Sequence, residues 1–349
     1  MTPRSRETRK RITLLDVARH AGVSRATASL VVRQSPLVGH TTRERVKEAM
    51  RSLGYVYNVG AARLRRGTSR TVGVIVPNLR NPFFAEMLDG IETVFDTEDM
   101  AVMLANSHED RNKQDAFLRR MREHDVDGVI VCPAAGSDES FLETTDTLDL
   151  TVVQALRWIS KDKIDYAGTD YADGMRQAVE HLKELGHRRI VFAAGDRQHS
   201  AYRDRLEGYQ AAIGCDEEPS VVKVPLTHQD GRSLARTLME HNQPPTAAIC
   251  FNDVIALGLL RGLFDLGIEV GPDFSLVGFD NVPEAALSRP ALTSVTTNPF
   301  AIGEAAARLL LRRLADPLVP PTRTIEPTHL VIRESTGPFA QTRQRDGGS

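Results

Sequence analysis

The sequence predicts an α/β protein: an N-terminal, all-α helix-turn-helix headpiece followed by a core of two lobes, each a doubly wound parallel sheet. Three observations support this prediction. Residues 1–70 are strongly basic, whereas the rest of the chain is acidic. Two short helix patterns stand close together near the N-terminus. From Thr71 onward, β-branched runs alternate with helix patterns across short connections, and such alternation produces parallel sheets.

The charge of the chain is unevenly distributed. The 349 residues carry a net charge of -2. Residues 1–70 hold 16 basic and 4 acidic residues, a balance of +12, and the remainder holds 28 basic and 42 acidic residues, a balance of -14. A basic segment on an acidic body indicates a head that binds a polyanion. A solvated tail would explain residues 1–11, which we expect to be disordered, but not the ordered pattern after them.

Composition argues against several other classes of protein. No apolar run is long enough to span a bilayer, and the basic start lacks the apolar stretch of a signal peptide, so we expect a cytoplasmic protein. The cysteines Cys132, Cys215 and Cys250 are far apart and form no metal-binding spacing, which predicts reduced thiols. No GxSxG, GxGxxG, Walker or HExxH motif occurs, so we expect no enzyme, cofactor or metal site. The C-terminal residues lack heptads, which argues against a tetramerising coiled coil.

The first two helices are predicted by their end signals. Thr13 is a suitable N-cap, and Asp16 three residues later resembles a capping box. Gly22 suits the left-handed position that ends a helix. Ser24 caps a second helix that extends to about Arg33. Since only three residues separate the two helices, the pattern predicts a helix-turn-helix.

A third helix is predicted to begin between Gly39 and Thr42 and to end at Gly54, which completes a headpiece of residues 12–57. Residues 58–70 form a hinge helix and linker. Gly60 lowers the helix propensity of this segment by about 1 kcal/mol relative to alanine. A helix of about eight residues is unstable alone in water. We therefore expect the hinge to be disordered or frayed until something holds it.

The core is predicted to occupy residues 71–340. The run TVGVIVP is typical of a strand buried on both faces. A second series of strands and helices opens with the strand DYAGTD, and the segments 300–314 and 324–334 cross back between the lobes. A small ligand is expected in the cleft between the lobes, at the carboxyl ends of the strands. The expected bounds are about 71–167 with 299–325 for the first lobe, about 168–298 with 326–340 for the second, and 341–349 for a disordered tail.

These motifs, in this order, resemble those of the LacI/GalR family of bacterial transcription regulators. ITLLDVARHAGVSRATASLVVR resembles its headpiece, and TTRERVKEAMRSLGYVYN its third helix and hinge start. RTVGVIVPNLRNPFFAEMLDGIE, ICFNDVIALGLLRGLFDLGIEVGPDFSLVGFDN and RPALTSVTTNP resemble its periplasmic-binding-protein-like core. The resemblance implies a homodimeric repressor that binds a near-palindromic DNA operator under control of a sugar-like effector in the interlobe cleft. The alternative is a cytoplasmic solute-binding protein without a regulatory role.

The resemblance also implies which residues bind DNA. The N-terminal part of the second helix meets base edges in the major groove, where Arg25 either bridges a guanine or binds phosphate alone. Leu30 stands where the family often has a base-contacting arginine; it either touches a thymine methyl or packs inward. The headpiece candidates are Thr13, Ser24, Arg25, Ala26, Thr27, Ser29, Leu30 and Arg33.

In the hinge, Asn58, Ala61, Leu64 and Arg65 are the candidates. In the family, the leucine that matches Leu64 wedges into the minor groove together with its dimer mate and kinks the DNA. The alternative is that Leu64 packs on the core. Tyr57 replaces the family's proline at the hinge entry.

Effector-binding residues are carried over by motif position. Phe83 and Phe84 match a site where the family stacks a ring on its ligand, although one of them is expected to pack in the core. Arg205 and Asp253 match effector-binding positions, with a salt bridge between them as the alternative. Leu156 replaces an aspartate that holds a sugar hydroxyl in many members. The complete candidate set is Asn78, Phe83, Phe84, Arg157, Arg205, Asp253 and Thr297.

Overall fold

The computed structural model describes residues 12–33, 35–55, 68–195, 197–214 and 218–339. The chain divides into two compact units, Met1–Ser69 and Arg70–Ser349, which are described here one at a time. The predicted hinge falls almost entirely on residues 56–67, and the two predicted disordered tails fall on 1–11 and 340–349. These predictions lie outside the described residues.

The three helices predicted for the headpiece are confirmed as α1 (Leu14–His20), α2 (Arg25–Val32) and α3 (His40–Leu53). Thr13 and Asp16 form the predicted capping box, in which the Thr13 N–H donates to the Asp16 carboxylate at 2.9 Å. The Ser24 hydroxyl accepts a hydrogen bond from the Thr27 N–H at 3.0 Å. Gly54 follows α3 with a φ of 61°, the left-handed conformation that a glycine adopts without strain.

The headpiece has its own small apolar core. Val17, Ala28 and Val46, one from each helix, are fully buried within it. Leu30 is half-buried and packs against the same cluster. This placement favours the inward-packing alternative for Leu30 over a contact with a thymine methyl.

The first lobe of the core is a six-stranded parallel sheet in the order β11-β5-β4-β3-β1-β2. Its central strands are rich in β-branched residues and are buried along their whole length, as a sheet with both faces covered requires. The elements are β1 (Thr71–Val76), α5 (Phe83–Thr97), β2 (Ala101–Asn106), α6 (Arg111–Glu123), β3 (Gly128–Val131), α7 (Ser140–Thr147), β4 (Val152–Ala155), β5 (Asp165–Thr169), α13 (Pro299–Ala315) and β11 (Arg323–Glu326).

The second lobe is a six-stranded sheet in the order β12-β10-β9-β8-β6-β7. All of its pairs are parallel except β10 with β12, which is antiparallel. The elements are α8 (Tyr171–Glu184), β6 (Ile190–Gly195), α9 (Ser200–Ile213), β7 (Ser220–Val224), α10 (His228–Met239), β8 (Ala247–Cys250), α11 (Asp253–Asp265), β9 (Ser275–Asp280), α12 (Pro283–Leu287), β10 (Thr293–Thr296) and β12 (His329–Val331).

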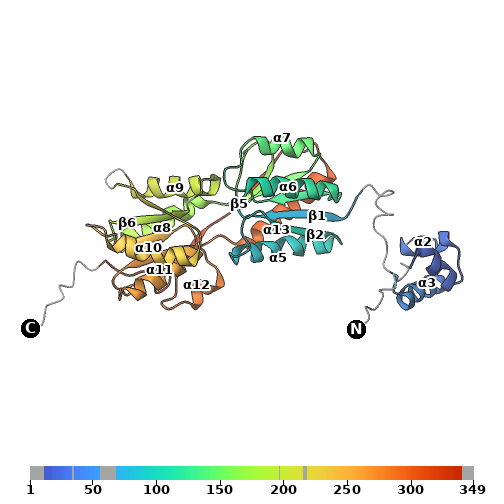
Figure 1. Ribbon diagram of the computed structural model, residues 1–349, viewed down its shortest axis with the longest axis horizontal. Coiled ribbons are helices and arrows are strands. Elements are labelled where there is room, and N and C mark those ends of the chain that lie inside the picture. Colours follow the sequence, from blue (N-terminus) through green and yellow to red (C-terminus); the bar gives the residue numbers. More distant parts are fainter. Residues whose placement is uncertain (1–11, 34, 56–67, 196, 215–217, 340–349) are drawn as a thin grey trace, which may run out of the picture. The chain divides into compact units, whose positions relative to one another are not determined.

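Helices cover both faces of each sheet (Figure 1). In the first lobe α5 packs against α13 on one face, and α6 and α7 lie on the other; in the second lobe α8 packs against α9, and α10 against α11. The contact between α5 and α13 is unusually close, because a Cβ atom on Gly90 would lie 2.1 Å from the Phe300 carbonyl oxygen. Only glycine permits this approach.

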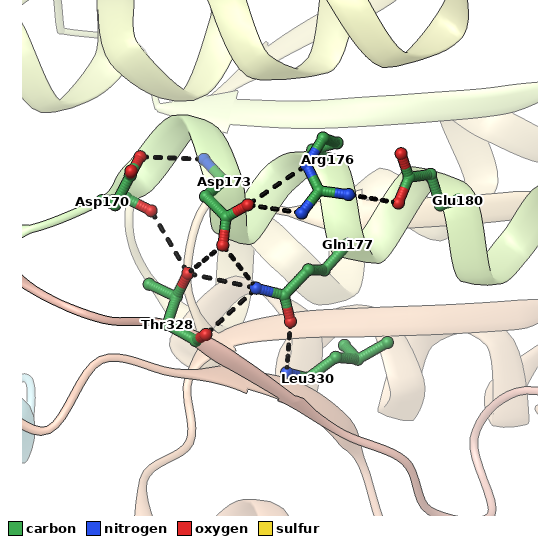
Figure 2. Close-up of polar contacts among 7 residues, drawn as sticks. All are labelled: Asp170, Asp173, Arg176, Gln177, Glu180, Thr328 and Leu330. Carbon is green, nitrogen blue, oxygen red and sulfur yellow. Dashed lines mark hydrogen bonds and ion pairs between the residues drawn. The ribbon is translucent and has the colours of Figure 1, made fainter.

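Three connections join the lobes: β5 to α8, β10 to α13, and β11 to β12. The third is tied to α8 by Gln177, whose side-chain amide donates to the Thr328 carbonyl oxygen at 3.0 Å and accepts from the Leu330 N–H at 3.0 Å (Figure 2). Thr169 and Asp170, at the first connection, bond to the Glu326 carbonyl oxygen. The chain therefore passes from one lobe to the other within the few residues between Glu326 and Thr328.

The structure differs from the predicted core in three respects. The strand DYAGTD does not open the second series: as β5 it pairs with β4 and β11 and completes the first sheet. The short β10 and α12 were not predicted from the sequence. The sheets are not wholly parallel, because the return of the chain after Pro327 lays β12 antiparallel to β10. The crossing of the late segments between the lobes is confirmed.

The cysteines agree with the sequence. Cys132 and Cys250 are buried free thiols, whereas Cys215 lies outside the described residues. Among the helices described, none combines the length and apolar character needed to cross a membrane.

Candidate functional site

The first candidate site is the exposed N-terminal end of α2 in the headpiece. Ser24, Arg25 and Ala26 are exposed there, as is Arg33 at the other end of the helix, while Thr27 and Ser29 are half-buried. The sequence of α2, RATASLVV, contains no carboxylate. This end of the helix therefore offers a guanidinium, hydroxyls and backbone N–H groups, which suit a phosphate or a base edge. Thr13 is exposed at the start of α1.

The hinge candidates Asn58, Ala61, Leu64 and Arg65 lie outside the described residues. Insertion of Leu64 into the minor groove therefore stays a prediction, and so does the alternative that Leu64 packs on the core.

The second candidate site is a cavity between the two lobes of the core. Its wall comes from α5 and the loops after β1, β2, β3 and β4 of the first lobe, and from α8, α9, the end of β9 and the loops after β6, β7 and β8 of the second. Its free volume is about 60 Å³, well below the 300–1,000 Å³ typical of small-molecule pockets. The two lobes therefore leave little free space between them at this site.

Five of the seven candidates line this cavity: Asn78, Phe83, Phe84, Arg157 and Arg205. Phe83 and Phe84 meet edge to face, with ring centroids 5.5 Å apart and an interplanar angle of 78°. Both belong to the apolar core of the first lobe and both also face the cavity. Each ring therefore both packs in the core and lines the cavity, whereas the sequence left open which ring does which.

Arg205 lies on α9 and is only 3% exposed. Its guanidinium carbon lies 3.9 Å from the ring centroid of Tyr171, 4.4 Å from that of Phe251 and 4.2 Å from that of Phe279, distances at which a cation is attracted to ring faces. One terminal nitrogen donates to the Ala201 carbonyl oxygen. The buried Nε has no hydrogen-bond partner, so one donor of the guanidinium is left unsatisfied.

Asp280, at the end of β9, is the carboxylate that faces Arg205. Its Oδ1 lies 3.8 Å from Nη2 of Arg205, and its Oδ2 accepts a hydrogen bond from the Asn81 side-chain amide at 3.2 Å. Burial raises the pKa of Asp280 to about 6, although Arg205 and Asn81 act in the opposite direction. Because Asn81 belongs to the first lobe, this hydrogen bond joins the lobes across the cavity.

The structure does not bring Asp253 and Thr297 to the cavity wall. Asp253 is fully buried behind it, where its carboxylate accepts hydrogen bonds from the Ser294 hydroxyl at 2.7 Å and the Val282 N–H at 2.8 Å. Burial, together with the nearby Asp280, raises its pKa well above the usual value. The alternative of a salt bridge between Arg205 and Asp253 is not supported, because the carboxylate that faces Arg205 is that of Asp280. Thr297 is fully buried, and its hydroxyl has no partner.

Arg157 is held on the first-lobe wall by Glu109. Its two terminal nitrogens donate to the two carboxylate oxygens at 2.8 and 2.7 Å, and one of them also donates to the Pro133 carbonyl oxygen at 3.0 Å. Burial would raise the pKa of Glu109, but Arg157 and a hydrogen bond from the Ala135 N–H lower it overall. Leu156, the departure from the family pattern, is also part of the wall.

His199 caps the N-terminus of α9, where its Nδ1 accepts a hydrogen bond from the Tyr202 N–H at 3.2 Å. Burial, and then the charges of Arg157, Arg205 and Arg203, lower its pKa well below 6.5, so the imidazole is neutral at pH 7.

A second contact between the lobes lies beside the cavity. The Trp158 indole N–H, from the loop after β4, donates to the Asp204 carboxylate on α9 at 3.2 Å. The Trp158 backbone N–H donates to the Ser200 hydroxyl at 2.7 Å. Burial raises the pKa of Asp204, which the hydrogen bond from Trp158 partly opposes.

Several lining residues were missed by the sequence analysis. Asp280 is the last residue of β9 and Asp253 follows β8, so the place of Asp280 at the carboxyl end of a strand was a usable signal. Glu109 follows β2 and so carried the same signal, but nothing in the sequence indicated that it meets Arg157, because only the fold brings the two together. The remaining residues that the sequence analysis did not select include Asn81, Tyr171, His199, Phe251 and Asn252. Within the described ranges, no three acidic, histidine or cysteine side chains gather as metal ligands would.

Comparison with known proteins identifies relatives over nearly the whole chain. Residues 13–58 match a family described as bacterial regulatory proteins of the lacI family, and residues 179–336 match one described as a periplasmic binding protein-like domain. Catabolite control protein A of Priestia megaterium is 33% identical over 330 residues, which cover 93% of this chain and 99% of that protein.

Solved structures are also similar to nearly the whole chain, and two of them are described here. One is a lac repressor dimer bound to operator and the anti-inducer ONPF; it has a TM-score of 0.84 and 26% identity, and the match covers 94% of this chain and 99% of that one. The other is a complex of the transcriptional regulator CelR with cellobiose; it has a TM-score of 0.71 and 30% identity, and the match covers 93% and 100%.

Proposed function

The chain belongs to the LacI family of bacterial regulatory proteins, and from this premise we propose that it represses transcription as a homodimer whose two headpieces bind a near-palindromic operator. Its helix-turn-helix unit binds DNA, and its two-lobed core binds a small-molecule effector that controls this binding. The matched family is one of regulatory proteins rather than enzymes. Because the proposed target is chromosomal DNA, the proposed location is the cytoplasm.

In the headpiece, the exposed end of α2 supports the proposed mode of DNA binding. Arg25 would enter the major groove and bridge a guanine, while Ser24, Thr27 and backbone N–H groups hold phosphates. Leu30 supports the headpiece core instead of reading a base. In the hinge, Leu64 would enter the minor groove, with Arg65 against the backbone.

The observation that carries the effector proposal is Arg205. It is a buried guanidinium between three aromatic rings, it has an unpartnered Nε, and it lies in a cavity to which both lobes contribute. Arg205 and Asp280 together offer a donor and an acceptor, which suit a pair of neighbouring hydroxyl groups on a sugar-like ligand.

Control of DNA binding would act through the distance between the lobes. Asn81 and Trp158 of the first lobe bond to Asp280 and Asp204 of the second, and a ligand between the lobes must change these contacts. In the homodimer, a shift of the first lobes changes the spacing of the two hinge segments. The coupling is reciprocal, so operator DNA changes effector affinity by the same factor as effector changes operator affinity.

Deletion of residues 1–67 tests the assignment of roles. The truncated chain should lose DNA retention and keep effector binding, whereas the full chain should retain DNA with a strong dependence on salt. If the truncated core still bound operator DNA, the assignment would be wrong. A full chain that showed no salt-dependent DNA binding would instead favour a solute-binding protein.

Leu64→Ala tests the hinge. We expect a much larger loss of specific than of non-specific DNA binding, because only the specific complex contains the kinked base step. Equal losses would favour packing of Leu64 on the core.

A further inference from the structure

The pair Glu109–Arg157 is the most completely bonded group of charges on the cavity wall. The side chains are 13% and 8% exposed and meet through two hydrogen bonds of 2.7 and 2.8 Å. Glu109 also accepts from the Ala135 N–H at 3.0 Å, and Arg157 also donates to the Pro133 carbonyl oxygen. All four residues belong to the first lobe, so movement of the second lobe does not break the pair.

The charge of the other arginine on the cavity wall is also compensated by a carboxylate. Arg205 faces Asp280 across 3.8 Å. The pKa of His199 is lowered by burial, and those of Cys132 and Tyr171 are raised by it, so these three side chains are neutral at pH 7. Two arginines and two carboxylates thus leave the ionisable groups of the wall with no net charge. Arg197, beside Glu109 in the second lobe, is exposed and therefore screened by solvent and salt.

We propose that Glu109 sets the charge selectivity of the cavity: by occupying Arg157 it reserves the site for an uncharged, hydroxyl-rich effector and excludes carboxylates and phosphates. This inference rests on the proposed function of the cavity as an effector site. An anion would have to displace a two-bonded carboxylate from Arg157 and would still face Glu109 and Asp280 in a poorly solvated space. A neutral ligand needs only the remaining donors and acceptors, among them the Arg205 Nε.

Glu109→Gln tests the proposal, with inorganic phosphate as the probe. The substitution keeps the shape of the side chain and an oxygen that can accept from Ala135, but it leaves the charge of Arg157 uncompensated. Phosphate should then bind and stabilise the folded variant. We expect a saturable rise in melting temperature and a phosphate affinity at least tenfold above that of the wild type, measured against sodium chloride at equal ionic strength.

Two matched variants separate this effect from a general change in charge. Glu139→Gln removes an exposed carboxylate paired with Lys163 at 3.2 Å and should leave phosphate binding unchanged. The double variant Glu109→Gln/Arg157→Gln should abolish the gain. If Glu109→Gln folds and gains no phosphate affinity, or if the double variant keeps the gain, the proposal is overturned.

The wild-type chain provides a second test, in which Arg157→Gln serves only to assign any observed anion binding to the cavity. Glucose with glucuronate, and ribose with ribose 5-phosphate, are pairs that differ chiefly in charge. Calorimetry should give no saturable binding of phosphate, glucuronate or ribose 5-phosphate to the cavity; binding of any of them that Arg157→Gln removes contradicts the proposal. DNA retention by the same preparation is scored separately, so a failure of the regulator assignment is distinguishable from a failure of charge selectivity.

Discussion

Asn81 and Asp280 join the two lobes of the core through a hydrogen bond of 3.2 Å, donated by the amide of Asn81 to the carboxylate of Asp280. The same carboxylate faces Arg205, the most deeply enclosed donor of the cavity. Asp280 therefore contacts both the first lobe, through Asn81, and Arg205, the group expected to hold the effector. The protonation of Asp280 and the effect of replacing it can both be measured.

The raised pKa of Asp280 predicts a pH-dependent contribution to stability. The unfolded chain releases this proton near the ordinary value of 3.8, whereas the folded chain releases it near 6. Between these values the folded state binds a proton that the unfolded state has lost, so this group's contribution to stability falls as the pH rises through that window. The loss is on the order of 1–3 kcal/mol.

Chemical denaturation of the wild type and of Asp280→Asn, from pH 4 to pH 8, measures this contribution. The difference in the free energy of unfolding should shift in favour of the variant from pH 4 upward and become constant only above about pH 7, where Asp280 is ionised in both states. A difference that does not change with pH would show that Asp280 titrates normally.

Trp158 predicts an optical signal for separation of the lobes. It is the one tryptophan of the chain, so its fluorescence reports on a single place. Asp204→Leu removes the acceptor of the indole N–H and should expose the ring, which also contacts Lys161 and Arg203. We expect a red-shifted emission and a several-fold weaker affinity for effector. Asp162→Asn, an exposed change in the loop that carries Trp158, is the control and should leave the spectrum unchanged.

The capping box of α1 predicts a local effect on the headpiece. Thr13→Ala removes the side chain that accepts from Asp16 and should weaken α1 by about 0.5–2 kcal/mol. Hydrogen exchange of the α1 amides in the full chain measures the loss, and Thr13→Ser should restore protection. Equal exchange in all three proteins would show that packing, rather than the cap, holds this helix.

Arg25 predicts a difference between specific and non-specific DNA binding. If it bridges a guanine, Arg25→Ala should weaken binding to an operator selected from random duplexes by about 1–3 kcal/mol and relax the preference at one position of each half-site. Arg51→Ala, on α3 and paired with Glu48, is the matched control. A uniform loss on all sequences, with a shallower salt dependence, would mean that Arg25 contacts phosphate alone.

Gln177 predicts a local anchor at the third connection between the lobes. Gln177→Leu leaves the Leu330 N–H and the Thr328 carbonyl oxygen without their partner and should cost about 1–3 kcal/mol. Faster hydrogen exchange at Leu330 is the expected signal. Gln229→Leu, at an exposed position of α10, is the control. Unchanged exchange at Leu330 would assign the anchoring to the β10–β12 pairing instead.

The sequence by itself determined where most elements begin and end. Thr13, Ser24 and Gly54 act on backbone groups within one turn of themselves, so their effects are visible in a short window of sequence. The buried strands were recognisable for a similar reason, because continuous β-branched runs suit a sheet that is covered on both faces. The order of these local patterns, together with the family resemblance, also gave the two-lobed core.

Only the tertiary structure decided which charges meet. Asp253 and Asp280 both belong to the carboxyl ends of strands. Asp253 begins α11 and its carboxylate bonds to Ser294 of β10, whereas the carboxylate of Asp280 faces Arg205. Glu109 reaches Arg157 across 48 positions of sequence, and β5 joins the first sheet through β4 and β11. Such pairings depend on how distant segments are packed, and no local pattern encodes that, because a side chain's neighbours are set by the fold and not by its position along the chain.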